Sequence, residues 1–180
     1  GGSTTPPVEA KQAPQKAANA WSPAEGFYPD YPDAWMNFHR SLKEQAAKGG
    51  VDLLFIGDSL TLGWDKDLWA ARYAPLKAAN FGVGGDGTPQ LLWRLEHGGF
   101  DGLKPKVVVL LIGINNVWPG YSAADTAKGM RTFVALLHEK EPGMSPHDVR
   151  DTLLSWCRPI LDKEQKPLHP DIQGTGFLKI

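Results

Sequence analysis

The chain has 180 residues and nearly balanced charge, with 19 Lys and Arg against 20 Asp and Glu and a formal net charge of −1. This length suits one domain with a substantial core, and the balanced charge provides no basic surface for nucleic acid or an anionic membrane. No apolar run approaches the roughly 18 residues needed to span a bilayer, so no transmembrane segment is predicted. The single Cys157 excludes an internal disulfide and a cysteine-based metal site.

The N-terminal segment differs in composition from the rest of the chain. Residues 1–30 are rich in Pro, Ala and Gln, and they lack the charged start and apolar core of a signal peptide. We expect this segment to be an arm or linker, with residues 31–180 forming the domain and with Trp21, Phe27 and Tyr28 pinning the later part of the segment onto it. Because such an arm suits a mature exported protein, the sequence favours a secreted or periplasmic location.

Three short apolar runs predict buried strands, and helical patterns separate them. The runs lie at 51–56 (VDLLFI), 78–81 and 106–112 (KVVVLLI), and their branched residues are typical of strands covered on both faces. Caps and glycine or proline stops predict helices at 33–48, 65–73, 88–97 and 122–139, with a further helix start at 145. This alternation predicts an α/β fold with a parallel sheet.

Each predicted strand is followed by a group that could act in catalysis. Ser59 follows the first strand, the glycine loop 82–87 follows the second, and Asn115 follows the third. Ligands bind at the carboxyl ends of strands in open α/β sheets, so we expect these groups to meet at one edge. A serine hydroxyl beside a backbone N–H and an asparagine amide would provide a nucleophile with an oxyanion hole, which fits acyl transfer.

Each of these motifs alone has a simpler interpretation. Gly-Asp-Ser is commonly a turn, and Asn115-Asn116 alone would be an ordinary strand-to-loop turn. The glycine loop superficially matches a dinucleotide-binding motif, but it follows the second strand, and no acidic residue ends the strand after it. The three motifs together, in order and at successive strand ends, favour a hydrolase over a nucleotide-binding protein.

These motifs resemble those of the SGNH, or GDSL, hydrolases. Residues 57–60 (GDSL) match the first block of the family, 80–86 (NFGVGGD) the second, and 113–116 (GINN) the third. Many members have Asp after the asparagine of the third block. Asn116 at that position, together with the second block and Leu92-Trp-Arg-Leu95, resembles the platelet-activating-factor acetylhydrolase-like branch.

The resemblance implies a fold, a site and a substrate class. The fold would be a flavodoxin-like three-layer sandwich with a central parallel sheet and a shortened C-terminal part. Ser59 would be the nucleophile, and its own N–H, the Gly85 N–H and the Asn115 amide would stabilise the oxyanion. The family uses no cofactor or metal. The substrate would be a small ester with a short, acetyl-type acyl group, on a carbohydrate or a lipid, and Trp64 or Trp118 could line its pocket.

The catalytic base is expected near the C-terminus, where this sequence departs from the family pattern. The family carries Asp-x-x-His, and His169, followed by Pro170, resembles that histidine, but Lys166 replaces the aspartate. The resemblance implies that His169 is the base, with Asp162 or Asp171 as a substitute partner. The alternatives are an exposed loop histidine in a catalytically impaired binding or scaffold protein, or a tail that a neighbouring subunit completes. Oligomeric state is left open.

Overall fold

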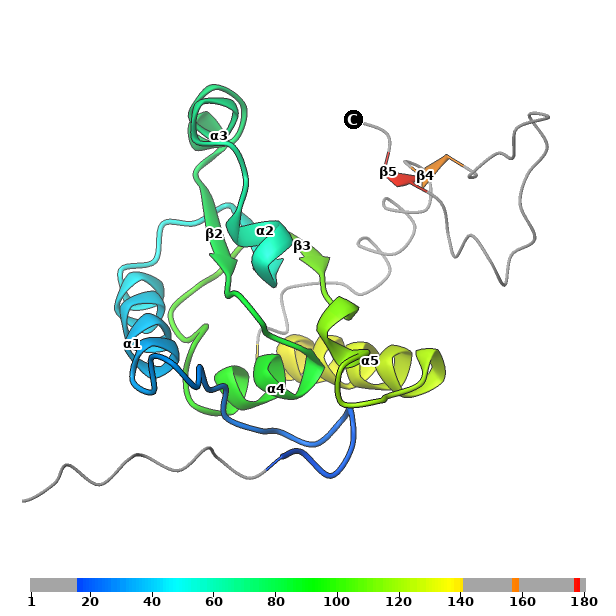
Figure 1. Cartoon of the computed structure of the whole chain (residues 1–180). Helices are drawn as coiled ribbons and strands as arrows, with labels where there is room; N and C mark the ends of the chain where they lie inside the picture. The colour runs from blue at the N-terminus through cyan, green and yellow to red at the C-terminus, as the bar shows by residue number, and fades with distance from the viewer. Residues whose placement is uncertain (1–15, 141–156, 159–176, 179–180) are drawn as a thin grey trace, which may run out of the picture. The chain divides into compact units, whose positions relative to one another are not determined.

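The computed structural model describes residues 16–140, 157–158 and 177–178. The chain divides into two compact units, residues 1–137 and 138–180. The first unit contains a parallel sheet of order β2-β1-β3 (Figure 1), formed by β1 (Leu53–Gly57), β2 (Ala78–Gly82) and β3 (Val107–Leu111). In the second unit, β4 (Cys157–Arg158) pairs antiparallel with β5 (Phe177–Leu178). The sequence pattern predicted the three parallel strands but neither of these two-residue strands.

The helices α1 (Ala34–Ala47), α3 (Lys66–Arg72), α4 (Thr88–Glu96) and α5 (Ala123–Lys140) lie close to the predicted positions. The short helix α2 (Ser59–Leu62) and the 3₁₀ turns η1 (Ala74–Leu76) and η2 (Ile114–Asn116) were not predicted. The predicted capping box of α5 is confirmed, because Asp125 N donates to Ser122 Oγ and Ser122 N donates to Asp125 Oδ2. The predicted helix start at 145 lies outside the described residues.

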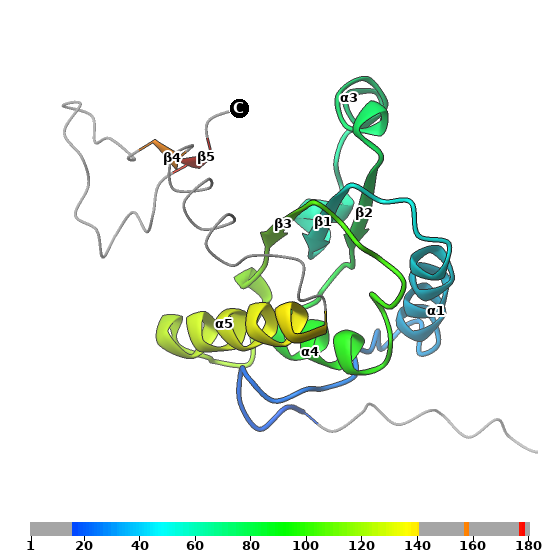
Figure 2. The same ribbon diagram turned by 180° about the vertical axis from the view of Figure 1, so that it is seen from behind.

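Strand register assigns the two faces of the sheet to different helices. Phe55 and Asn80 are register partners on adjacent strands and therefore share a face. Phe55 packs edge-on against Trp69 and Tyr73, so α3 and its flanking residues cover this face. Figures 1 and 2 agree in showing α3 on one side of the sheet and α1, α4 and α5 on the other.

The opposite face contains the larger buried core. Ile56 and Phe81 are register partners and both are fully buried. The Phe81 ring packs on Phe100, which packs edge-on against Phe133 of α5. Helices therefore cover both faces, and the predicted α/β class with a central parallel sheet is confirmed.

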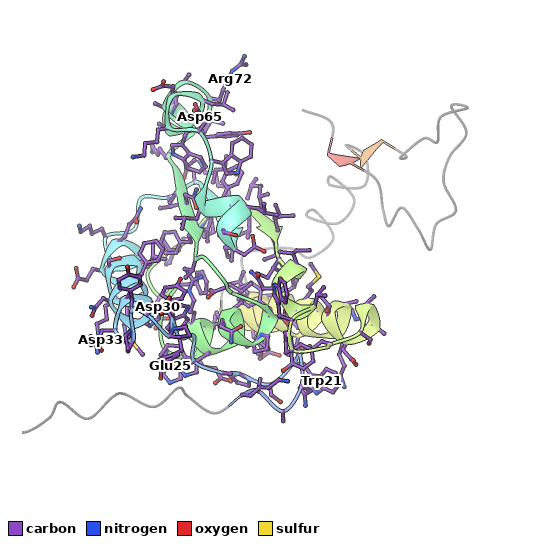
Figure 3. The ribbon with its side chains drawn as sticks, viewed as in Figure 1. Trp21, Glu25, Asp30, Asp33, Asp65 and Arg72 are labelled. Atoms are coloured by element: carbon purple, nitrogen blue, oxygen red, sulfur yellow. The ribbon has the colours of Figure 1, made fainter. Side chains whose placement is uncertain are left out.

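The described part of the N-terminal segment is tied to this core. Thr88 Oγ1 donates to Ala20 O over 2.6 Å, and the Lys128 ammonium lies 3.5 Å from the centre of the Trp21 ring. Gly129 makes room for this segment inside α5, because a Cβ there would overlap Ala20 O. Figure 3 labels Trp21 and Glu25 along the segment, which runs beneath α4 and α5 in that view. The division into an arm at residues 1–30 and a domain at residues 31–180 stays a prediction, although the described residues of the arm contact the core.

A buried histidine lies between α1 and α4. His39 is 4% exposed, stacks on Trp35 and contacts the edge of Trp93. Burial, together with the positive charges of Arg94, Lys43, His97 and Arg40, lowers the pKa of His39 to about 4. His39 is therefore neutral in the folded protein at neutral pH.

This burial predicts a loss of stability in mild acid. Between pH 6.5 and 4 the unfolded chain binds a proton at His39 that the folded chain excludes, so stability falls as pH falls. We expect wild type to lose ~2 kcal/mol more than His39→Phe between pH 7 and pH 4.5 in urea titrations. Comparing the two proteins cancels other titrating groups, Asp86 included, and an equal loss in both would contradict this assignment.

Candidate active site

Ser59 lies at the carboxyl end of the central strand, as predicted. β1 ends at Gly57, whose register partners are Gly82 of β2 and Leu111 of β3. The chain then turns directly into α2, where the Asp58 side chain caps the helix by accepting from Leu60 N over 2.9 Å. Ser59 is the first residue of α2 and is exposed, so its hydroxyl is accessible at the sheet edge.

Two paired glycines allow α2 to pack directly against the strand ends. A Cβ on Gly82 would overlap the backbone of α2 at Leu62 N, and a Cβ on Gly57 would overlap Thr61 and Leu111 O. Asn80 ties the same elements together, since its Nδ2 donates to Thr61 O over 2.6 Å. The position of Ser59 thus depends on small residues at the ends of both strands.

The glycine loop after β2 has a fixed conformation. Gly85 adopts a φ of +78°, in the left-handed region that favours glycine, and it is exposed. On either side, Asp86 N donates to Val83 O over 3.2 Å, and Tyr28 Oη donates to Gly84 O over 2.6 Å. The loop that carries the predicted oxyanion glycine is therefore held by its own turn and by the N-terminal segment.

The structure brings Asn115 against this loop. Asn115 lies in η2, just beyond β3, and its Nδ2 donates to Asp86 O over 2.9 Å. The side chain of Asn115 is therefore fixed at the Asp86–Gly87 peptide, one residue beyond Gly85. An amide nitrogen has two hydrogens, and this bond engages one of them.

The neighbouring Asn116 has a different role, which the sequence pattern did not reveal. It is 1% exposed, and its Oδ1 accepts from Thr88 N over 2.9 Å. Its Nδ2 donates to the hydroxyls of Thr88 and Thr126. Asn116 therefore joins η2 to the start of α4 and to α5, which explains an amide where many members of the resembling family have aspartate.

A buried ion pair lies behind the glycine loop, and the sequence analysis missed it. The Asp86 carboxylate accepts from Arg94 Nη1 over 3.0 Å and from Trp35 Nε1 over 2.7 Å. Asp86 and Arg94 are both fully buried. Burial raises the pKa of Asp86 to about 6, although the Arg94 charge and the bond from Trp35 oppose the rise. The signal available in the sequence was an arginine on the otherwise apolar face of α4.

A cavity of about 220 Å³ adjoins this region. Asn115 lines it, together with Gly87 and Gln90 at the start of α4 and with Glu25 and Phe27 of the N-terminal segment. Neither Ser59 nor Gly85 is among its lining residues. The cavity therefore lies on the Asn115 side of the strand-end edge.

The two tryptophans considered for a substrate pocket have different surroundings. Trp64 packs edge-on against Phe55 and Tyr73, so it belongs to the aromatic cluster that covers one face of the sheet. Trp118 is 87% exposed. Neither residue lines the cavity.

His169, the expected base, lies outside the described residues, as do Asp162, Lys166 and Asp171. Among residues 16–140 and the two short strands, no group of three His, Cys, Asp or Glu side chains could hold a metal ion. Over the same residues, the search for membrane spans finds no helix with the length and hydropathy to cross a bilayer.

The sheet order and the motifs at all three strand ends define an SGNH-type α/β fold. The model of the GDSL-like Lipase/Acylhydrolase family matches residues 55–171, and the chain belongs to that family. The resemblance inferred from the three sequence blocks is thereby confirmed.

The similar curated proteins are named as acetylhydrolases. The chain is 38% identical over 109 residues to platelet-activating factor acetylhydrolase IB subunit alpha1 of Homo sapiens, covering 60% of this chain and 46% of that protein. It is 37% identical over 111 residues to subunit alpha2 of Gallus gallus, covering 61% and 48%. The chain thus spans about half the length of these relatives.

A solved structure from Streptococcus pneumonia, named for platelet activating factor, has a similar fold. It aligns with a TM-score of 0.50 and 20% sequence identity, over 59% of this chain and 50% of that one. At this identity the similarity supports the fold alone.

The contact between Gly82 and α2 predicts that a side chain at position 82 lowers the free energy of unfolding. Gly82→Ala should destabilise the protein by about 1–3 kcal/mol, because the Cβ would overlap backbone that cannot rotate away. Gly84→Ala is the matched control, since its Cβ would meet only Tyr28 Oη, at 3.6 Å. Chemical denaturation measures both, and equal stability of the two variants would refute the close packing described here.

Proposed function

We propose that the chain is a serine esterase that hydrolyses carboxylic esters with short, acetyl-type acyl groups through an acyl-enzyme. Membership of the GDSL-like Lipase/Acylhydrolase family supports ester hydrolysis in general. The observation that carries the site assignment is the bond from Asn115 Nδ2 to Asp86 O. It ties the side-chain amide to the residue that follows Gly85 in the glycine loop, and Ser59 begins α2 at the same edge of the sheet.

In the proposed reaction, Ser59 Oγ attacks the ester carbonyl carbon and gives its proton to the imidazole of His169. Negative charge develops on the carbonyl oxygen, where the N–H groups of Ser59 and Gly85 and the Asn115 amide stabilise it. The tetrahedral intermediate then collapses, and the leaving alcohol takes the proton from the imidazolium. Water, deprotonated by the same imidazole, attacks the acyl-enzyme and releases the carboxylic acid and free Ser59.

The named relatives support a short acyl group. The relatives at 37–38% identity are named as acetylhydrolases. An acetyl-type ester of a small alcohol, a carbohydrate or a lipid fits these names.

A second candidate function is a binding or scaffold protein with impaired catalysis. Lys166 stands where the family pattern has the aspartate that orients the histidine, and the loss of that partner removes a large part of triad catalysis. The family match extends to residue 171, past His169, which supports the catalytic candidate.

The nucleophile assignment predicts that hydrolysis of p-nitrophenyl acetate depends on Ser59. Ser59→Ala should reduce turnover to the rate of nonspecific reaction with surface groups, because the other hydroxyl of α2, on Thr61, is buried. Ser41→Ala is the control, since this exposed serine on α1 bonds only to Phe38 O. Equal rates for wild type and Ser59→Ala would rule out the serine mechanism.

The base assignment is tested separately at the C-terminal segment. His169→Ala should lower kcat by about 10²–10⁴, with His147→Ala as a second histidine substitution from the same part of the sequence. Unchanged turnover in His169→Ala alongside a dead Ser59→Ala would assign the base to another group. No serine-dependent turnover in wild type would favour the binding or scaffold protein.

A further inference from the structure

We propose that Trp35 is a positioning residue for the reaction, acting through the buried carboxylate of Asp86 with Arg94 as its counter-ion. This inference rests on the proposed function. It adds a residue of α1, which lies before the first strand, to a site otherwise made from the three strand ends.

Asp86 connects to both proposed oxyanion donors through its backbone. Its nitrogen belongs to the peptide that follows Gly85, and its carbonyl oxygen accepts from Asn115 Nδ2 over 2.9 Å. A displacement of the Asp86 backbone would therefore shift the Gly85 N–H and the Asn115 amide at the same time. The side chain of Asp86 is buried, so bonds to it from the core can fix the position of its backbone.

Two groups fix that side chain from the interior. Trp35 Nε1 donates to Oδ1 over 2.7 Å, and Arg94 Nη1 donates to Oδ2 over 3.0 Å. Arg94 also donates through Nη2 to Phe81 O in β2, over 3.1 Å. The carboxylate is thus bonded to α1 and α4, and through Arg94 it is linked to β2, the strand that leads into the glycine loop.

Stability alone is a weak reason for this arrangement. Removing two charges from water costs several kcal/mol, and well-packed apolar replacements of a buried ion pair are often neutral or stabilising. Asp86, Arg94 and Trp35 are at most 1% exposed. A fixed, directional set of bonds instead limits the positions available to the loop, which is the requirement of a preorganised oxyanion hole.

Trp35 is the member of this set whose substitution removes one bond to Asp86 without leaving an unpaired buried charge. Its indole is enclosed, since a Cβ on Gly26 would overlap the ring, and it packs on Trp93 and His39. Phenylalanine keeps an aromatic ring at this position and removes the N–H donor. Trp93→Phe is the matched control, because Trp93 belongs to the same aromatic cluster and packs against Trp35, His39 and His97.

The kinetic test compares Trp35→Phe with Trp93→Phe, using p-nitrophenyl acetate and thermal unfolding. A misplacement of the oxyanion donors acts on the transition state, so Trp35→Phe should lower kcat about 10- to 100-fold with KM within about twofold. Trp93→Phe should retain the wild-type kcat, although it also removes aromatic contacts from the cluster. Parallel loss of kcat and Tm in both variants, or an unchanged kcat in Trp35→Phe, would overturn the inference.

A second measurement does not require turnover. In ¹⁵N-labelled protein, Trp35→Phe should shift the Gly85 backbone amide and the Asn115 side-chain amide resonances, whereas Trp93→Phe should leave both in place. Unshifted resonances in Trp35→Phe overturn the positioning role. Shifted resonances in a protein without Ser59-dependent turnover support the positioning role and refute the proposed function, so the two failures are distinguishable.

Discussion

The arrangement of the candidate site depends on the buried carboxylate of Asp86. Its bonds to Trp35 and Arg94 place a charge in the core, and its carbonyl holds the amide of Asn115. The glycine loop, α1, α4 and the segment after β3 thereby meet at one residue. Burying a charge there costs desolvation free energy. In return, the bonds of the carboxylate hold the glycine loop in one position.

The register of the parallel strands supplies the second constraint. Gly57, Gly82 and Leu111 are aligned across the sheet, so the segments that follow them start from the same edge. The paired glycines also let α2 pack against the strand ends. The N-terminal segment closes the Asn115 side of this edge, where Glu25 and Phe27 line the cavity. Elements distant in sequence therefore contribute to one surface.

The strands and longer helices could be predicted from sequence because their signals are local. Residues 107–112 form a continuous apolar run, and Ser122 with Asp125 forms a capping box. The positions of Ser59, Gly85 and Asn115 after successive strands followed from the same pattern. The Asp86–Arg94 pair could not be predicted, because hydropathy places charged residues at the surface and the compensating bonds come from distant elements. The docking of residues 16–28 could be expected from the aromatic side chains of Trp21 and Tyr28. Its individual bonds could not, because they run mostly through backbone carbonyls such as Ala20 O, which composition does not encode.

The central claim is that Ser59 is an activated nucleophile beside a formed oxyanion hole. Reaction with a fluorophosphonate, followed by intact-mass analysis and peptide mapping, tests it most directly, because the reagent requires both an activated hydroxyl and stabilisation of a developing oxyanion. The account predicts one adduct per chain, located on Ser59 and formed more slowly in Asn115→Ala. An unmodified wild-type protein, or an adduct on another residue, would contradict it.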